Sequence, residues 1–478
     1  MTHYSVWGRR LVRYLSVEGR SFRGDYSGKL PEAVLDRLSA QGITDPNHLQ
    51  RKCLDVLLDG SQEAAVINAE TGSGKTFCFL LPILRLFSEL WSSGGAIPSS
   101  SSLILVPTPH LGYQIQSLYR SLADPLWGSS ISHHSAKLTL MPSTSLVIAT
   151  PTSLVQYDLQ RVLRHVRLLC VDEADALLTG SEKESTLTIM DTLRKNNDQT
   201  NKTEIPSTVS EPTDCSTREI FQTRFIFTAA TLPSGGKQTV QSRLKRWLPK
   251  NTLHITTDNT HKLLPTAELR FVTIEATVTG DRERPKIASK RLNIAKRQQL
   301  IKDLCGLDTN QTPPKVLIFC NSVLSGEHLH RFLARPLPDL YNLTPPHWWS
   351  DKVGRLFKQE DGDVSSLEDT LKRFQTGALN VLVCSNLGCR GLDLRDVTAV
   401  IQYDFPGNVA EFIHRAGRTA RAGRCGHVIS YVDEESSGLA NQIRDTSGGS
   451  MDRLFSRNKM LRRRLNRTVA SEQQSVCV

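Results

Sequence analysis

An α/β fold built on parallel β-sheets is predicted by three features of this 478-residue sequence. The first is a series of short apolar runs separated by helical patterns, which indicates parallel sheets covered by helices on both faces. These runs lie at residues 64–67, 103–106, 146–149 and 168–171. The second is that polar clusters follow the runs directly, at the strand ends where such sheets bind ligands. The third is that similar runs at 316–320, 381–384 and 397–401 predict a second domain of the same class.

Composition and charge narrow the class of protein. The apolar content of 39% and charged content of 22% are typical of a globular protein, and the length suits two to four domains of roughly 100–200 residues each. The net charge of +11 favours an anionic macromolecular partner such as nucleic acid. No apolar run reaches the roughly 18 residues of a membrane span, so we expect no membrane contact. The ten cysteines lack metal-ligand spacing, so we expect neither zinc nor a disulfide framework.

A phosphate-binding loop is predicted between the first apolar run and a helical segment that begins at Phe77. In a strand–loop–helix unit, backbone N–H groups and the helix N-terminus point at phosphate oxygens. We expect Lys75 to reach the β- and γ-phosphates and Thr76 to hold Mg²⁺ through its hydroxyl. A plain glycine-rich turn is the alternative, but the strand–loop–helix order favours nucleotide binding. The predicted nucleotide contacts of the loop are Ala69, Glu70, Thr71, Gly72, Ser73, Gly74, Lys75 and Thr76.

Residues on both sides of the loop suggest the rest of an ATP site. Gln50 offers one acceptor and one donor, which is the pattern that an adenine edge requires. Phe22 or Tyr26 lies far enough upstream to stack on the base. Asp172 and Glu173 follow an apolar run, and phosphoryl transfer to water needs one carboxylate for Mg²⁺ and a second to orient or deprotonate the water. An acidic turn that caps a helix is the alternative interpretation of this pair.

The chain resembles a DEAD-box RNA helicase over roughly residues 30–435. Beside the loop at 69–76, the resemblance rests on Asp172-Glu173-Ala174-Asp175, Cys389-Arg390-Gly391-Leu392-Asp393 and His414-Arg415-Ala416-Gly417-Arg418-Thr419-Ala420-Arg421. The Gln50 segment also matches the adenine-recognising motif of this family. The resemblance implies two tandem RecA-like domains, each a parallel sheet with helices on both faces, with ATP and Mg²⁺ in the interdomain cleft. It also implies that RNA stimulates ATP hydrolysis.

By the same resemblance, the second domain supplies the other half of the ATP site. Arg418 and Arg421, three apart on one side of a predicted helical turn, would act as arginine fingers. Asp393 would meet the nucleotide. The alternative is a basic helix face that binds RNA phosphates, to which His414 and Arg415 would contribute.

Further residues are assigned to RNA and to coupling by the resemblance alone. The implied RNA contacts are Pro107, Thr108, Thr150, Pro151, Asn321, Ser385, Arg390 and Gly391. The residues implied in coupling the ATP state to RNA are Asp175, Ala229, Thr231 and His414.

The departures from the family pattern cluster on the RNA side. Pro109-His110 replaces an Arg-Glu pair, Ser153 replaces an arginine, Ala229 a serine and Asn386 an aspartate, and the usual Gln-x-x-Arg is missing. Several phosphate-binding arginines are thus absent, which weakens the electrostatic grip on RNA and flattens its salt dependence. An ATP-gated RNA clamp or ribosome-assembly scaffold with little unwinding is therefore the alternative function.

The expected domain organisation places basic segments at both ends. Residues 1–28 form a basic leader that is typical of a mitochondrial targeting segment, with a frayed RNA-binding end as the alternative. The remaining boundaries are 29–257 for the ATP-binding domain, with a disordered insertion at 195–218, 258–268 for the linker, 269–435 for the C-terminal domain and 436–478 for a basic tail. Within the tail, the pattern at 453–467 predicts an auxiliary RNA-binding helix, with a solvated basic face or a nuclear signal as alternatives.

The sequence thus predicts an ATP-dependent RNA helicase that unwinds short duplexes or remodels RNA–protein complexes. We expect a monomer that acts on RNA, with ribosomal RNA favoured and ribosome-assembly proteins as possible partners. The predicted location is mitochondrial, with nucleolar or cytoplasmic as alternatives. A DNA helicase is a third possibility, distinguished by equal stimulation of ATP hydrolysis by single-stranded DNA and RNA.

Overall fold

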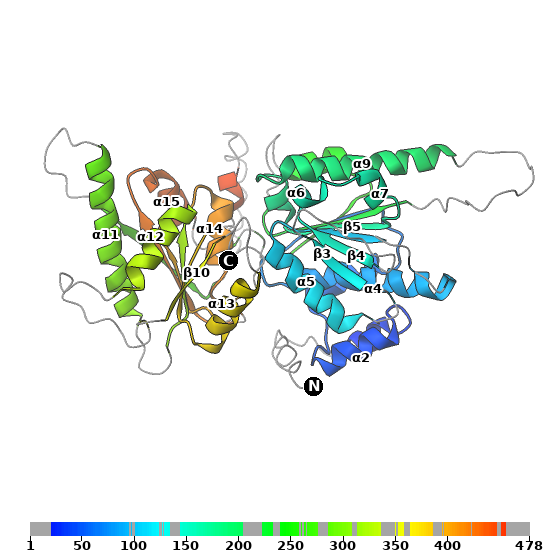
Figure 1. Ribbon diagram of the computed structural model, residues 1–478, viewed down its shortest axis with the longest axis horizontal. Helices are drawn as coiled ribbons and strands as arrows, with labels where there is room; N and C mark the ends of the chain where they lie inside the picture. Colours follow the sequence, from blue (N-terminus) through cyan, green and yellow to red (C-terminus); the bar gives the residue numbers. More distant parts are fainter. Residues whose placement is uncertain are drawn as a thin grey trace, which may run out of the picture. The chain divides into compact units, whose positions relative to one another are not determined.

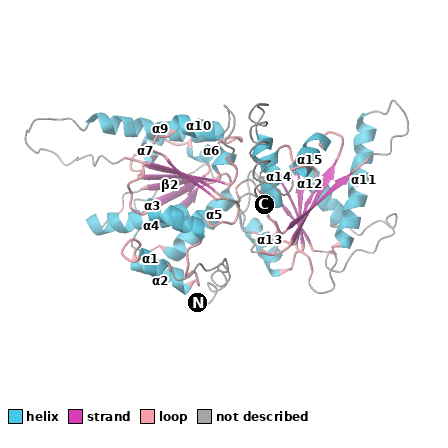
Figure 2. Cartoon of the chain, turned by 180° about the vertical axis from the view of Figure 1, so that it is seen from behind, coloured by secondary structure: helices cyan, strands magenta, loops and turns pink. Residues whose placement is uncertain are grey.

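The structure is a computed structural model that folds into two compact units, Met1–Thr260 and His261–Val478, each described here by itself. The described residues are 21–94, 97, 101–123, 127, 129–133, 144–203, 222–232, 240–257, 260, 262–263, 265–275, 285–307, 313–335, 349, 352–357, 364–385, 394, 396–421, 423–446 and 451–455. Each unit has a central sheet between layers of helices (Figure 2).

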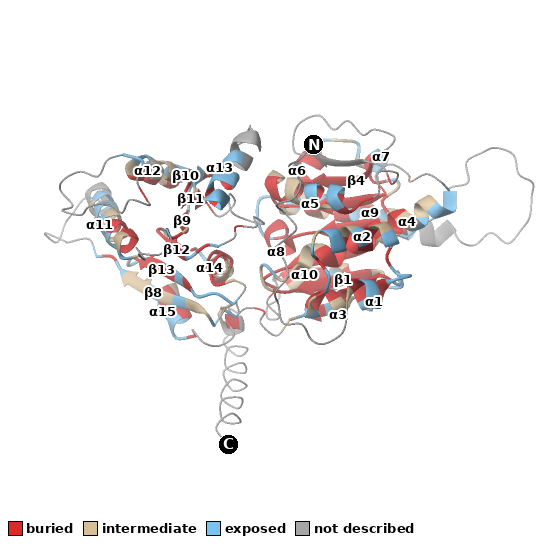
Figure 3. Ribbon diagram, turned by 90° about the horizontal axis from the view of Figure 1, so that it is seen from below, coloured by how far each residue is buried: buried red, intermediate tan, exposed pale blue. Residues whose placement is uncertain are grey.

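The sheet of the first unit contains seven described strands in the order β3-β4-β2-β5-β6-β1-β7, and every pairing between them is parallel. The strands are β1 Ala64–Asn68, β2 Ser102–Leu105, β3 Ser129–His133, β4 Thr144–Ala149, β5 Leu168–Val171, β6 Arg224–Ala229 and β7 Leu253–Thr256. The central strands are buried on both faces (Figure 3). This burial explains why they read as continuous apolar runs.

Helices cover both faces of this sheet, with α9 opposite α4 and α5 (Figure 1). Alternate strand residues divide between the two faces, so that Ile104 packs with α3, α4 and α5 while Leu103 and Leu105 pack with α7, α9 and α10. The helices are α1 Phe22–Tyr26, α2 Glu32–Ala40, α3 His48–Leu57, α4 Lys75–Gly94, α5 Pro109–Leu122, α6 Pro151–Leu154, α7 Leu159–Val162, α8 Ala174–Leu177, α9 Lys183–Thr203 and α10 Val240–Trp247.

The second unit repeats the architecture with six described strands in the order β10-β11-β9-β12-β13-β8, again paired in parallel. The strands are β8 Ala267–Thr273, β9 Val316–Cys320, β10 Val353–Leu356, β11 Val381–Ser385, β12 Ala399–Gln402 and β13 Gly426–Val432. The helices are α11 Pro285–Gly306, α12 Val323–Leu333, α13 Val364–Thr376, α14 Val409–Ala416, α15 Ser437–Arg444 and the 3₁₀ helix η3 Met451–Phe455. The two predicted parallel sheets are therefore confirmed.

Three segments differ from the expected domain organisation. The helix α9 continues to Thr203, so residues 195–203 of the expected disordered insertion are helical. Asn197 anchors them, because its side chain donates to Thr223 O and accepts from Thr223 N, both at 3.0 Å. At the two ends, α1 belongs to the first unit, and α15 and η3 bury Ile443 and Met451 in the second unit. The globular part therefore begins before residue 29 and extends beyond 435.

Several other expectations can be placed. Trp349 is buried in the core of the second unit and presents no ring face for stacking on a base. Residues 456–467 of the tail helix predicted at 453–467 fall outside the described residues. So do residues 1–20 of the leader and residues 204–218 of the insertion. Among the helices that the structure describes, no helix is both long and apolar enough to cross a membrane.

Candidate active site

The phosphate-binding loop connects β1 to α4, and the N-terminus of α3 packs onto it. Asn47 caps α3 and its Nδ2 donates to Ser73 O at 2.8 Å, while Gln50 Nε2 donates to Gly74 O at 3.3 Å. Gly74 has φ +81°, and a Cβ there would lie 2.5 Å from Gln50 Nε2, so the loop needs glycine at this position. Gln50 Oε1 also accepts from Asn47 N at 2.9 Å. One N–H and one lone pair of the amide then remain for an adenine edge.

The side chain of Lys75 turns back onto the start of the loop. Its Nζ donates to Ala69 O at 2.7 Å and to Glu70 O at 2.8 Å. Burial lowers the pKa of this lysine, against the attraction of Asp172 and the other acidic groups nearby. A triphosphate would have to draw the ammonium away from these two carbonyl groups, which are weaker partners than phosphate oxygens.

The side chain of Glu70 is held by a neighbouring strand end. Its Oε2 accepts from Thr257 Oγ1 at 2.6 Å, just beyond β7. Thr257 also donates its backbone N–H to Asn68 O at 3.2 Å. The carboxylate of the loop is therefore fixed by Thr257, a contact that the sequence pattern does not predict.

The predicted catalytic carboxylates lie directly after β5. Asp172 Oδ1 accepts from Glu173 N at 3.0 Å and from the hydroxyl of Thr228 in a short contact. Burial, with a further contribution from the charge of Glu173, raises the pKa of Asp172 to about 6. Glu173 has left-handed backbone angles (φ 50°, ψ 50°), and its buried Oε2 has no hydrogen-bond partner among the described residues. A buried acceptor of this kind needs a donor such as water.

The end of β6 is tied to the same acidic segment. Asp175 Oδ2 accepts from both the backbone N–H and the hydroxyl of Thr231, at 3.0 and 2.5 Å. Ala229, which lacks the hydroxyl expected by resemblance, is fully buried in the core. The connection between the acidic turn and β6 is thus made by Thr228 and Thr231.

The two aromatic candidates for adenine stacking are both covered by protein. Phe22 is 2% exposed and Tyr26 is 1% exposed, and Tyr26 Oη donates to Asp55 Oδ1 at 3.0 Å. Neither ring therefore presents a free face, and the stacking hypothesis is wrong for this conformation. The reason is that α1 packs against α2 and α3 as part of the core.

The predicted RNA contacts of the first unit lie at the carboxyl ends of the neighbouring strands β2 and β4. Thr108 caps α5, and Pro151 opens α6 after Thr150. Ser153, at the position of the missing arginine, donates to Thr150 O at 2.8 Å. Thr152 N donates to Glu182 Oε2 at 2.8 Å, so a carboxylate binds the residue before the position where the family pattern predicts a cation.

His110 is also buried at this edge. No described residue forms a hydrogen bond with either ring nitrogen, and burial lowers the pKa of His110 to about 4. The ring is therefore neutral at physiological pH. Pro107, which precedes the cap of α5, lies at the same strand end.

In the second unit, the arginine pair does not lie on a helix as predicted. The helix α14 ends at Ala416, Ala420 has φ +58°, and Arg421 Nε donates back to Gly417 O at 2.7 Å. A Cβ on Gly426 would lie 2.6 Å from Ala420 N, so this backbone packs directly against the start of β13. Arg418 is only 4% exposed.

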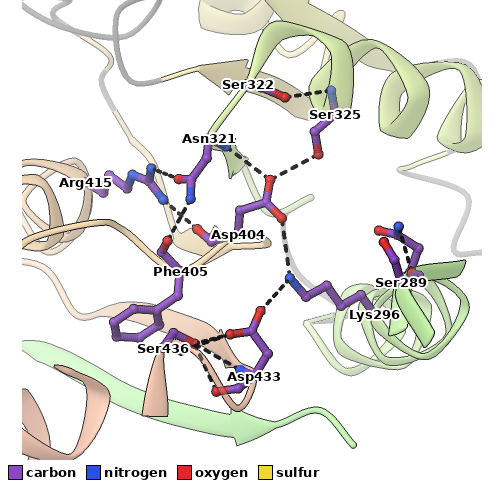
Figure 4. A network of polar contacts seen from close by, with 11 residues as sticks. Ser289, Lys296, Asn321, Ser322, Ser325, Asp404, Phe405, Arg415, Asp433 and Ser436 are labelled. Carbon is purple, nitrogen blue, oxygen red and sulfur yellow. Dashed lines mark hydrogen bonds and ion pairs between the residues drawn. The ribbon is translucent and has the colours of Figure 1, made fainter. Parts of the chain in front are cut away.

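Arg415 is buried, and its hydrogen bonds connect the segments after β9 and β12. Its guanidinium donates to Asp404 O at 2.7 Å and to Asn321 Oδ1 at 2.6 Å (Figure 4). It also stacks over the ring of Phe319. At 1% exposure it offers no surface to RNA phosphates, so that hypothesis is wrong for Arg415. Asn321, a predicted RNA contact, also donates through Nδ2 to Phe405 O at 2.9 Å.

Other predicted residues are only partly placed. Ser385 ends β11 and His414 lies within α14, and both are buried. Arg390, Gly391 and Asp393 lie outside the described residues, as does the departure at Asn386. Among the residues that sequence reasoning missed, Asn47 could have been found, because Asn followed three positions later by Gln is a helix-capping pattern.

Comparison with protein families agrees with this geometry. The family described as DEAD/DEAH box helicase matches residues 47–239, and the one described as Helicase conserved C-terminal domain matches residues 295–423. The first match spans the loop and the acidic turn, and the second spans the arginine pair.

Curated relatives give the same classification at low identity. The chain is 28% identical over 405 residues to mouse "Probable ATP-dependent RNA helicase DDX28", covering 82% of this chain and 66% of that protein. It is 26% identical over 444 residues to "ATP-dependent RNA helicase dbp8" of Aspergillus terreus, covering 88% of this chain and 72% of that protein.

Solved structures with the same fold support the two-unit architecture. Dbp5 of S. cerevisiae bound to RNA and ADP BeF3 has a TM-score of 0.61 at 18% identity, covering 88% of this chain and 93% of that one. Mss116p bound to ssRNA and AMP-PNP has a TM-score of 0.66 at 20% identity, covering 91% and 79%. The chain belongs to the DEAD-box family of ATP-dependent RNA helicases, in superfamily 2.

Proposed function

We propose that this protein hydrolyses ATP in response to RNA and uses the cycle to unwind short RNA duplexes or remodel RNA–protein complexes. The observation that carries the proposal is a set of charged side chains at one edge of the first sheet whose hydrogen bonding within the described residues is incomplete. There, among the described residues, Lys75 has only carbonyl partners and Glu173 Oε2 has no partner. Such groups suit the phosphates and attacking water of ATP hydrolysis.

The acidic turn also fits Mg²⁺. The donor set proposed for the ion is all oxygen, the Asp172 carboxylate and the Thr76 hydroxyl, as magnesium prefers. Burial and Glu173 raise the pKa of Asp172 to about 6, so a cation would stabilise its charged form. When bound, the ion would neutralise charge on the phosphates.

The remaining chemistry is assigned to side chains of this chain. Lys75 would leave the two loop carbonyls and bind the phosphates, and Gln50 would read the adenine edge through its remaining N–H and lone pair. Glu173 would orient or deprotonate the attacking water. Arg418 and Arg421 would complete the site from the second unit, which would make hydrolysis depend on closure around RNA.

A second candidate function, an ATP-gated RNA clamp or assembly scaffold, is favoured by the RNA edge of the first unit. At that edge Glu182 binds the backbone of Thr152, Ser153 bonds internally and His110 is neutral. Fewer cations mean a weaker grip on the strand that unwinding must hold.

A strand-release assay on a short RNA duplex separates the two functions, with Glu173→Gln as the hydrolysis-deficient control. ATP-dependent release that is lost in Glu173→Gln supports the helicase. Nucleotide-dependent retention of RNA without release supports the clamp. Equal stimulation of ATP hydrolysis by single-stranded DNA and RNA would contradict the assignment to RNA.

The biological setting stays a prediction from the sequence. The basic leader favours mitochondria, and the basic tail favours a structured RNA such as ribosomal RNA. Fluorescence localisation of the full chain and of a form without residues 1–20 tests the first. Crosslinking of bound RNA in cells tests the second, and light scattering tests the expected monomer.

A further inference from the structure

A partly buried charge network in the second unit lies outside the proposed ATP half-site (Figure 4). Lys296 of α11 places Nζ 3.4 Å from Asp404 and 3.3 Å from Asp433, and its side chain is 7% exposed. The two carboxylates follow the neighbouring strands β12 and β13, so one ammonium joins two strand ends. Burial alone would raise the pKa of Asp433, but hydrogen bonds from Ser436 and the charge of Lys296 lower it.

Asp404 connects this lysine to the segment after β9. One carboxylate oxygen, Oδ1, faces Lys296. The other, Oδ2, accepts from Asn321 N at 3.1 Å and from Ser325 Oγ at 3.0 Å. A single side chain therefore bridges α11 and residues 321–325, which comprise the β9–α12 connection and the first turn of α12.

Arg415 holds the same connection from the other side, through Asp404 O and Asn321 Oδ1. The network contains two cations, Lys296 and Arg415, and two carboxylates, Asp404 and Asp433. Removal of one partner from such a balanced, partly buried network leaves an uncompensated charge, which is destabilising unless water solvates it. Asp404 is 19% exposed at its side chain, so it can turn towards solvent when Lys296 is removed.

We propose that Lys296 positions residues 321–325 for RNA by holding Asp404 against Asn321 N and Ser325 Oγ. The inference rests on the proposed function, because RNA binding is part of that proposal and Asn321 is assigned to RNA by the family resemblance and not by a bound ligand. Lys296 is a positioning residue, since its ammonium is enclosed by the two carboxylates and lies over the ring of Tyr403. Without it, Asp404 would release the segment, and RNA would have to order the segment as it binds.

Hydrogen exchange tests the positioning directly and needs no enzymatic activity. In Lys296→Met, the amides of residues 321–325 should exchange about tenfold faster than in the wild type, which corresponds to loss of one charge-assisted hydrogen bond. Lys296→Arg, which keeps the charge, should restore most of the protection. Unchanged exchange at 321–325 in Lys296→Met would overturn the proposal.

Asp303→Asn is the matched control. Asp303 is also buried in the second unit, with Arg270 and Tyr431 as partners, and it makes no contact with Asp404 among the hydrogen bonds of the described residues. This variant should lose stability without faster exchange at 321–325. Equal deprotection of that segment in Asp303→Asn would mean general loosening and would count against a specific role of Lys296.

The RNA concentration that gives half-maximal ATPase stimulation provides the functional test. It should rise about tenfold in Lys296→Met and stay near the wild-type value in Asp303→Asn.

If Lys296→Met fails to fold, Asp433→Asn should shift the same constant and the same exchange rates in the same direction by a smaller factor. A weaker RNA response with unchanged exchange would make Lys296 a direct RNA contact and overturn positioning. A wild-type ATPase that ignores RNA would contradict the proposed function, and the exchange result would still decide this inference.

Discussion

At one edge of the first sheet, the residues assigned to ATP and the residues assigned to RNA differ in how many charges they carry. In the part assigned to ATP, Lys75 is a half-buried cation with two backbone carbonyls as hydrogen-bond partners, Asp172 is a buried carboxylate, and Glu173 has an oxygen without a described partner. In the RNA part, Ser153 is bonded internally, and Glu182 accepts the N–H of Thr152. The difference teaches that a member of this family can keep the charges assigned to the nucleotide while the described residues at the edge assigned to RNA, Ser153 and His110, are uncharged.

This difference has a physical basis in the two ligands. A triphosphate with its metal is compact, so a few buried groups must match it closely. RNA presents its phosphates along an extended strand, so a cation that is absent at one phosphate can be replaced by a cation elsewhere on the protein. The following predictions test the two parts, from the largest expected effect to the smallest.

The largest effect is expected at the arginine pair of the second unit. Changing Arg418 and Arg421 together to alanine should lower RNA-stimulated ATP hydrolysis by about three to five decades, because arginine fingers stabilise transition-state charge. Steady-state phosphate release measures the loss, and fluorescent ATP-analogue binding shows whether the first-unit site survives. The paired lysine variant controls for charge alone and should recover little, because lysine lacks the planar fork. Undiminished hydrolysis in the double alanine variant would contradict the proposed mechanism.

Glu173→Gln should come next, with ATP hydrolysis reduced by about two to four decades, as expected for loss of a general base. Nucleotide binding should persist, because Lys75 and Asp172 remain. Single-turnover hydrolysis measures the chemical step. Glu182→Gln is the matched control, as it makes the same chemical change at the RNA part of the edge and should leave that step near the wild-type rate.

A smaller gain is expected from restoring charge to the RNA part. Ser153→Arg combined with Glu182→Gln should tighten single-stranded RNA binding about tenfold, the equivalent of one good ionic contact. The slope of log affinity against log salt should steepen by about 0.7, as for one added phosphate contact. Fluorescence anisotropy at several salt concentrations gives both values. Ala40→Arg combined with Asp45→Asn adds the same charge at two exposed positions and controls for net charge. An equal gain in this control would mean that the position of the added charge does not matter.

The smallest effect concerns the stability of the ligand-free, metal-free protein. The pKa of Asp172 is raised from 3.8 to about 6, chiefly by burial. Above pH 6 the carboxylate is charged in both states and its burial disfavours folding, whereas below about pH 4 it is protonated in both and the penalty disappears. Asp172→Asn, whose amide oxygen can still accept from Thr228, should raise Tm by a few degrees at pH 7.5. Calorimetry should show this gain fading towards pH 4, and a gain that grows on acidification would contradict the assigned cause.

The sequence by itself determined the class of fold, the position of the loop and the acidic turn. These features are local, because apolar runs, glycine spacing and adjacent carboxylates each act within a few residues. The same locality explains two errors. Helical spacing suggested that Arg418 and Arg421 share a helix, and the number of residues before Gln50 suggested that Phe22 or Tyr26 stacks on adenine.

Only the tertiary structure decided those points, because each depends on contacts between residues far apart in the chain. Thr266 donates its hydroxyl to Ala420 O at 3.2 Å and Thr419 donates its hydroxyl to Val397 O at 2.7 Å, and these contacts fix the path of the arginine segment. The packing of α1 covers the two aromatic rings. The hydrogen bonds that Arg415 donates to Asn321 and Asp404 join three separate segments of the second unit. A polar side chain can be assigned a chemistry from its neighbours in sequence, but whether that chemistry is free for a ligand depends on the partners that folding brings to it.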